Sequence, residues 1–266
     1  KMETVKFEEL GLYPQLLRAI KEIGFEEATP IQSQAIPVVM SGVDVIGQAQ
    51  TGTGKTASFG IPLLMKVDPN NKKTQAIVLS PTRELAIQSA EEIRKLAKYM
   101  HGIKVLPIYG GQEIVKQIRS LKSGTQLVIG TPGRVMDHMR RKTMKMDHVH
   151  TIVLDEADEM LNMGFQDSIT EILEGIPEER NTLLFSATMS REVERVAKGY
   201  LHDYKEIVVG SRNEGAENVN HVYYMVNAKD KYLALKRIVD FYPKIYAIVF
   251  CRTKRAVDEL VSSLDA

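Results

Sequence analysis

The sequence has 266 residues, 44% of them apolar and 26% charged, with 35 basic against 34 acidic side chains and a net charge of +1. This balance excludes a disordered, highly charged tail protein, and the length suggests one complete domain with part of another. The single cysteine, Cys251, excludes an internal disulfide and favours a cytoplasmic location, and the lack of any apolar run of about 18 residues predicts no membrane partner.

Short apolar runs alternate with longer segments of helical period along the chain. The runs are rich in Val, Ile and Leu and show little alternation, which is typical of strands buried on both faces. The candidate strands are 44–47, 75–80, 103–109, 126–130, 151–155, 182–186 and 206–209. Repeated strand–helix alternation predicts an α/β fold with a mostly parallel sheet covered by helices on both faces. Binding sites in such sheets collect at the carboxyl ends of the strands.

The chain changes character near residue 210. We predict a first domain over 1–210, a polar linker over 211–218 and a partial second domain over 219–266. The last segment is predicted to hold a helix at 229–241, a strand at 245–251 that buries Cys251, and a final helix. About 48 residues are few for an independent α/β domain, so we expect only the start of one.

The strand at 44–47 is followed by Ala49-Gln50-Thr51-Gly52-Thr53-Gly54-Lys55-Thr56, which opens a helical segment. Glycines let several backbone N–H groups point at one anion, and the helix start adds partial positive charge. Lys55 can reach phosphates and the Thr56 hydroxyl can bind Mg²⁺. The pattern predicts a phosphate-binding loop; the alternative is a glycine-rich turn. The candidate cofactor-binding residues of this loop are Gln50, Thr51, Gly52, Thr53, Gly54, Lys55 and Thr56.

Acidic residues end the strand at 151–155. Asp155 can hold Mg²⁺, and Glu156 can deprotonate an attacking water, so Lys55, Asp155 and Glu156 are the candidate catalytic residues. The alternative is an ordinary acidic helix start. Ser186 and Thr188 follow the strand at 182–186, where their hydroxyls could bond the Asp158 carboxylate or cap a helix.

Together these segments resemble the DEAD-box ATP-dependent RNA helicases of superfamily two. The resemblance covers nearly the whole chain and rests on many short motifs in the family's order. The matching segments are Gly24-Phe25 with Thr29-Pro30-Ile31-Gln32 (the Q motif, with Phe7 upstream), 49–56, Pro81-Thr82-Arg83-Glu84-Leu85-Ala86, Gly110-Gly111, Thr131-Pro132-Gly133-Arg134, Asp155-Glu156-Ala157-Asp158, Ser186-Ala187-Thr188 and 248–253. The resemblance implies a RecA-like P-loop NTPase domain followed by a truncated second RecA-like domain.

The resemblance also implies roles for individual residues. ATP and Mg²⁺ would be the cofactors, with Phe7, Thr29 and Gln32 at the adenine and Thr56 and Asp155 on the metal. The Gln32 carboxamide can both donate and accept, which suits adenine over guanine. RNA would be the partner, alongside RNA-processing or ribosome-assembly proteins. The residues assigned to RNA are Pro81, Thr82, Arg83, Gly110, Gly111, Thr131 and Arg134, and those assigned to coupling are Asp158, Ser186 and Thr188.

Alternatives stay open for several of these assignments. Phe7 could instead be a core residue, Thr29 a helix cap, and Thr82 and Thr131 caps of following helices. The basic run at 140–145 is more typical of a solvated helix end. The family's later motifs are absent, so we expect an incomplete chain that cannot finish the helicase cycle alone. Its rivals are a nucleotide- and RNA-binding module without turnover, and a P-loop NTPase acting on DNA or a small acceptor.

Overall fold

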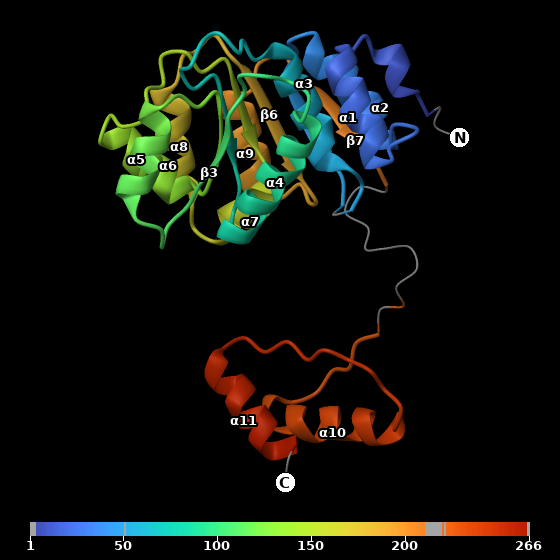
Figure 1. The fold of residues 1–266 in the computed structure, drawn as a ribbon. Coiled ribbons are helices and arrows are strands. Elements are labelled where there is room, and N and C mark those ends of the chain that lie inside the picture. Colours follow the sequence, from blue (N-terminus) through green and yellow to red (C-terminus); the bar gives the residue numbers. More distant parts are fainter. Residues whose placement is uncertain (1–3, 51, 211–219, 221, 265–266) are drawn as a thin grey trace. The chain divides into compact units, whose positions relative to one another are not determined.

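The computed structural model describes residues 4–50, 52–210, 220 and 222–264 (Figure 1). The chain forms two compact units, Lys1–Glu214 and Gly215–Ala266. The division falls among residues outside the described ranges, as does the linker predicted at 211–218.

The first unit is built on one parallel sheet. Its described strands are β1 (Val45–Gln48), β2 (Ala76–Leu79), β3 (Val105–Ile108), β4 (Leu127–Gly130), β5 (Thr151–Leu154), β6 (Asn181–Ser186) and β7 (Lys205–Val208). They lie in the order β3-β4-β2-β5-β6-β1-β7, and every neighbouring pair is parallel. The predicted α/β fold and parallel sheet are confirmed, and each strand end lies within two residues of the predicted one.

Helices cover both faces of this sheet, as predicted. Their bounds are α1 (Pro14–Ile23), α2 (Pro30–Met40), α3 (Lys55–Lys66), α4 (Arg83–Leu96), α5 (Ile114–Lys122), α6 (Pro132–Arg140), α7 (Ala157–Asn162), α8 (Gln166–Gly175) and α9 (Arg191–Tyr200). Side chains of α1 to α4 share a core with Val78 of β2, whereas those of α6 to α9 share a second core with Ile77 and Leu79. Successive strand residues point to opposite faces, so in the strands between the edge strands β3 and β7 both sets are buried, and most of these strands read as apolar runs.

Local sequence signals start the helices that carry the polar loops. Thr29 and Thr82 accept hydrogen bonds from the backbone N–H groups of Gln32 and Leu85, which caps α2 and α4. Ser190 caps α9 in the same way. Thr131 precedes Pro132 at the start of α6 but makes no side-chain cap. The capping alternative is thus realised at Thr29 and Thr82 and not at Thr131.

The second unit contains helices and, among its described residues, no strand. It has η2 (Ala228–Asp230), α10 (Lys231–Phe241) and α11 (Lys254–Leu264), which correspond to the two predicted helices. The strand predicted at 245–251 is wrong: this segment is irregular, Phe250 is 89% exposed and Cys251 is half-buried rather than a core residue. A strand needs a neighbour to pair with, and no described residue of this unit supplies one.

In the described part of the chain, none of the helices combines the length and the apolar character needed to cross a bilayer.

Candidate functional site

The polar loops of the first unit follow the carboxyl ends of its strands and divide along the sheet. The phosphate loop, the acidic residues and the Ser186 loop follow β1, β5 and β6, which are neighbours in the order β5-β6-β1. The loops that begin at Ser80, Tyr109 and Thr131 follow β2, β3 and β4, which are neighbours in the order β3-β4-β2. The sheet therefore holds two groups of loops side by side along one edge.

The phosphate loop is braced by the segment that opens α2. The Thr29 hydroxyl donates to the Thr53 carbonyl at 2.8 Å, and Gln32 Nε2 donates to the Gly54 carbonyl at 3.0 Å. Gly54 has φ +79°, and a Cβ there would lie 2.4 Å from Gln32 Nε2, so only glycine fits. Within the loop, Thr53 Oγ1 donates to the Gln50 carbonyl at 2.8 Å. Thr51 lies outside the described residues.

Gln32 connects the start of α2 with the phosphate loop and is itself 2% exposed. Its Oε1 accepts from the Thr29 backbone N–H at 2.9 Å, and its Nε2 donates to Gly54. A carboxamide has two acceptor positions and two donor hydrogens, so each end keeps one for a ligand. The Gln32 amide can therefore bind a base edge without leaving its protein partners.

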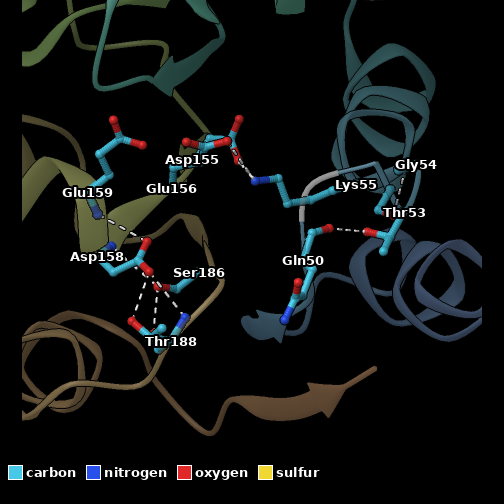
Figure 2. A network of polar contacts seen from close by, with 11 residues as sticks. Gln50, Thr53, Gly54, Lys55, Asp155, Glu156, Asp158, Glu159, Ser186 and Thr188 are labelled. Atoms are coloured by element: carbon cyan, nitrogen blue, oxygen red, sulfur yellow. Dashed lines mark hydrogen bonds and ion pairs between the residues drawn. The ribbon is translucent and has the colours of Figure 1, made fainter. Parts of the chain in front are cut away.

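Lys55 joins the phosphate loop to the acidic residues (Figure 2). Its Nζ lies 2.9 Å from Asp155 Oδ1 and 3.5 Å from Glu156 Oε1. Burial opposes the charge on Lys55, but the two carboxylates outweigh it and raise the pKa of the lysine. Burial also disfavours the charged form of Asp155 and so raises the pKa of this carboxyl group. The nearby Lys55 ammonium opposes the shift only in part. Glu156 sits at the start of α7 with φ 51°, a left-handed conformation uncommon for a non-glycine residue.

A pocket of about 560 Å³ connects these groups. Its lining includes residues from the α2 start, the phosphate loop, the acidic loop and α4. Those residues are Ile23, Phe25, Thr29, Gln32, Gly52, Gly54, Lys55, Thr56, Ala57, Leu85, Gln88, Ser89, Glu92, Lys95, Leu96, Asp155 and Glu156. The volume is in the range of small-molecule sites. The sequence did not indicate the α4 contribution, because helix face and sheet order decide it.

The aromatic ring at this pocket is not the one expected from the sequence. Phe7 is 2% exposed and belongs to the core, so the structure does not offer its ring to a base. Phe25 is 40% exposed, lines the pocket and stacks on Phe7 with ring centroids 6.4 Å apart. The core alternative for Phe7 holds in this structure, and Phe25 takes its place at the pocket.

The residues expected to hold Mg²⁺ line this pocket together. Thr56 supplies a hydroxyl and Asp155 a carboxylate, both hard oxygen donors. Among the described residues, no group of three or more His, Cys, Asp or Glu side chains could hold a metal ion by itself. This sparse donor set fits Mg²⁺, which usually takes one or two protein oxygens and completes its shell with phosphates and water.

Asp158 connects the acidic loop with the loop after β6 (Figure 2). Its Oδ2 accepts from the Thr188 hydroxyl at 2.8 Å and from the Thr188 N–H at 3.1 Å. The Ser186 hydroxyl instead accepts from the Asp158 backbone N–H at 3.3 Å and donates to the Thr188 carbonyl at 2.7 Å. The two loops are thus tied together by side chains.

The second group of loops presents backbone and cationic groups at the edge. Pro81 and Thr82 lead into α4, and the Arg83 guanidinium lies 5.0 Å from the centre of the Tyr109 ring. Gly110 and Gly111, directly after Tyr109, are exposed. This cation–π contact holds Arg83 beside the glycine pair.

Arg134 does not point freely to solvent. Its Nη1 donates to the Gln112 carbonyl at 2.9 Å and to Gln117 Oε1 at 3.1 Å. Gln117 in turn donates to the Tyr109 carbonyl at 3.0 Å. Arg134 therefore braces the glycine-pair loop from within, and it would contact RNA only with its remaining N–H groups.

His138 completes this network, although no motif of the sequence indicated it. It is fully buried, with Nε2 2.8 Å from Gln117 Oε1 and Nδ1 2.8 Å from Thr143 Oγ1. Burial, assisted by the charge of Arg134, lowers the pKa of His138 to about 4. Neutral His138 donates from Nε2, because Gln117 Oε1 can only accept.

The basic run that begins at Arg140, the last residue of α6, divides between two environments. Arg140 pairs with both carboxylate oxygens of Glu171, at 2.7 and 2.6 Å, and Arg141 pairs with Asp137 at 2.8 Å. These are exposed ion pairs, as the solvated-helix alternative predicts. Lys142 and Lys145 form no such ion pair with a described residue and instead line a separate pocket.

Comparisons with known proteins place the chain among helicases. The DEAD/DEAH box helicase family model matches residues 29–196. The chain is 50% identical to the ATP-dependent RNA helicase CshA of Listeria monocytogenes, over 98% of this chain and 50% of that protein. It is 50% identical to the DEAD-box ATP-dependent RNA helicase CshA of Bacillus subtilis, over 98% of this chain and 53% of that protein.

A solved structure is similar over almost all of the chain. The crystal structure of a DEAD box protein from the hyperthermophile Methanococcus jannaschii is 43% identical, with a TM-score of 0.75. The match covers 99% of this chain and 71% of that one. The chain spans about half the length of the curated relatives it matches.

Proposed function

We propose that this chain, which belongs to the DEAD/DEAH box helicase family, acts as the ATP-binding unit of an ATP-dependent RNA helicase. The observation that carries the proposal is the division of the carboxyl edge, where a nucleotide-sized pocket follows β5, β6 and β1 and backbone-exposing loops follow β3, β4 and β2. The CshA relatives named as ATP-dependent RNA helicases support both ligands.

Adenine would lie against Phe25, with its polar edge on the free donor and acceptor of Gln32. The phosphates would lie at the loop from Gly52 to Lys55, where the start of α3 adds partial positive charge. Lys55 then exchanges its carboxylate partners for phosphate oxygens. In the absence of nucleotide, the Lys55 ammonium pairs with Asp155, and in its presence the same charge would bind phosphate.

Hydrolysis would use the carboxylates that Lys55 releases. Glu156 would accept the proton of the attacking water, and its half-buried position beside the pocket supports this role. Asp155 and Thr56 would hold Mg²⁺, which when bound offsets the negative charge of the phosphates. Lys55 would stabilise the charge that develops on the transferred phosphoryl group.

RNA would lie along the other group of loops, held by backbone and by charge rather than by base identity. Exposed Gly110 and Gly111 allow close approach of a phosphate, and Arg83 lies beside them. The hydrogen bonds between Asp158 and Thr188 would transmit changes at the acidic loop to the loop after β6. Strand separation would follow from coupling these two sites.

A second candidate function is nucleotide and RNA binding without turnover. The pocket lining among described residues contains two cations, Lys55 and Lys95, and no arginine. Phosphoryl transfer gains much of its rate from an arginine aimed at the developing charge. This observation favours slow or absent hydrolysis by the 266-residue chain by itself.

The first test is a titration of ADP against GDP, with Gln32→Ala and the same-helix control Gln34→Ala. We expect the chain to prefer ADP, and Gln32→Ala to lose that preference while Gln34→Ala keeps it. Equal affinity for ADP and GDP in the unmodified chain would remove the adenine assignment. RNA-stimulated ATP hydrolysis, measured on the same chain, then decides between the two candidate functions.

We also propose a cytoplasmic location and partners among RNA-processing or ribosome-assembly proteins. The single cysteine supports the former, and the RNA helicase names of the relatives support the latter.

A further inference from the structure

A pocket lined by lysines lies at the amino-terminal edge of the sheet, opposite the edge with the phosphate loop. Its volume is about 420 Å³. The lining comes from 72–74 before β2, 121–124 between α5 and β4, and 142–145 after α6. Its cations, which define what we call the lysine pocket, are Lys72, Lys73, Lys122, Lys142 and Lys145.

The charge of the lysine pocket differs from that of the chain. Its lining carries a formal +5 with no carboxylate, whereas the whole chain carries +1, so the rest of the chain carries −4. Lys73 has an acidic neighbour, Asp147, at 3.7 Å. The other four lysines form no ion pair with any described residue. Such a concentration of unpaired like charge favours an anionic ligand.

Helix ends account for only part of this cluster. Lys122 is the last residue of α5, where a cation suits the partial negative charge of the helix terminus. Lys72 and Lys73 precede a strand, and Lys145 lies five residues beyond the end of α6, so no helix dipole favours them. The Lys72 carbonyl accepts from the Thr125 N–H at 3.0 Å, which fixes this lysine segment beside the α5–β4 turn.

Two helices lead from the candidate RNA loops to the lysine pocket. The helix α5 starts just after Gly110-Gly111 and ends at Lys122, and α6 starts at the Thr131 loop and ends before Lys142. Figure 1 shows α5 and α6 beside each other at one end of the first unit. Nine helical residues span about 13 Å, or about four stacked nucleotides. Exposed Arg119, three residues before Lys122, lies on this route.

We propose that the lysine pocket binds phosphates of the same RNA strand, beyond the segment held by the loops after β2, β3 and β4. The RNA would continue along α5 from Gly110-Gly111 to Lys122, Lys142 and Lys145. This inference rests on the proposed function, since it takes RNA to lie at those loops. Lysine ammonium groups act as point charges, so the pocket would add affinity without reading bases.

The test compares a 6-nucleotide with a 20-nucleotide oligouridine, bound to the full chain and measured by fluorescence anisotropy at several salt concentrations. The variant K122Q/K142Q/K145Q removes three charges from exposed side chains. It should bind the 20-mer about tenfold more weakly, and the slope of log K against log salt should fall by about 2, at about 0.7 per lost contact on a single strand. Its affinity for the 6-mer should not change.

The matched control is K21Q/K198Q/K205Q, which removes three exposed lysines from α1, α9 and β7. It has the same net charge as the test variant and should bind the 20-mer like the unmodified chain. Thermal melting of both variants checks the fold. As a measurement without mutation, the 20-mer and not the 6-mer should protect Lys122, Lys142 and Lys145 from acetylation.

Three outcomes would overturn the proposal. If both triple variants weaken 20-mer binding equally, or neither does, the pocket has no special part, and the proposed function stands on the 6-mer result. If the unmodified chain binds neither RNA, this inference fails together with the RNA part of the proposed function. If polyglutamate of matched charge displaces the 20-mer as effectively as oligouridine, the pocket takes acidic polypeptides instead.

Discussion

Lys55 stabilises the pocket in its ligand-free state, because its charge compensates the buried carboxylate of Asp155. Lys55 and Asp155 are 8% and 4% exposed, and their charged atoms lie 2.9 Å apart. The removal of one partner of a buried pair leaves an uncompensated charge, whereas the removal of both charges leaves none.

The first prediction follows from this pair. Lys55→Ala should lower the free energy of unfolding at pH 7 by about 3 kcal/mol, measured in urea. The double variant K55A/D155N should recover most of that loss, although neither variant should bind ADP. A double variant no more stable than K55A would show that the uncompensated Asp155 carboxylate is not the cause of the loss.

His138 gives a pH-dependent prediction. Its pKa is about 4 in the folded chain and about 6.5 when unfolded, so the unfolded chain binds the extra proton between these values. Stability contributed by neutral His138 is complete above pH 6.5 and is lost as the pH falls towards 4, by roughly 2 kcal/mol at pH 5. Urea unfolding at pH 7 and pH 5 measures it.

The control for this prediction is His138→Gln, which cannot titrate. The unmodified chain should lose more stability than the variant between pH 7 and pH 5, because the carboxylates contribute equally to both. Parallel losses would mean that folding does not lower the pKa of His138, because the folded and unfolded chains would then take up its proton over the same pH range.

At the residue scale the sequence indicated chemistry better than position. The spacing around Lys55 and Asp155 indicated phosphate and metal chemistry, and the structure places both at one pocket. It could not show that Phe7 is buried behind Phe25, because both are isolated aromatic residues in a polar segment. Gln117 also carried no signal, since its partners come from other strands and helices.

At the scale of elements, β1 and β6 approach closely beside the phosphate loop. Gly47 pairs with Phe185, and a Cβ on Gly47 would lie 2.6 Å from the Phe185 ring. That ring is fully buried and packs against Phe59, with centroids 5.5 Å apart, so it has little room to move. The glycine is required by packing and not by backbone angle.

Gly47→Ala should therefore lower the free energy of unfolding by about 1–3 kcal/mol through overpacking. The matched control is Gly199→Ala in α9, where no atom lies within 4 Å of the added Cβ. That variant should be more stable by about 0.5–1 kcal/mol, because alanine favours helix. Chemical unfolding of both variants measures these changes. If the two substitutions changed the free energy of unfolding in the same direction, the packing argument would be contradicted.

The elements themselves were predictable where apolar patterning and pairing agree. The seven described strands of the first unit were located within two residues, because most of them are buried on both faces and read as apolar runs. The edge strand β7 is an exception, since its first two residues are exposed. The run at 245–251 has the same composition and is no strand. Composition indicates a preference for extended backbone. Whether a strand forms also depends on a neighbouring strand to pair with, which other parts of the fold must supply.

At the scale of the whole molecule, the two units differ in how much they bury. The first has two apolar cores, whereas no described residue of the second is buried. Few buried contacts mean low resistance to local opening.

We expect the second unit to open first. Amide exchange should be fast throughout α10 and α11 and slow in β1, β2 and β5, as mass spectrometry of peptic fragments would show. Removal of residues 215–266 should leave the melting temperature of the first unit unchanged. A large decrease in that temperature would mean that the second unit stabilises the first.

The strand order also determines when each part of the first unit can form during synthesis. The strands β3, β4, β2 and β5 are complete by residue 154, but β1 must wait for β6, about 130 residues after its own end. At roughly 5–20 residues per second the ribosome takes about 7–25 s to supply that partner. A nascent chain that has emerged from the ribosome to about residue 160 would thus carry the loops proposed to contact RNA on a paired sheet, while its phosphate loop still lacks the neighbouring strand β6. The proposed nucleotide pocket is therefore the later part of this edge to form during synthesis.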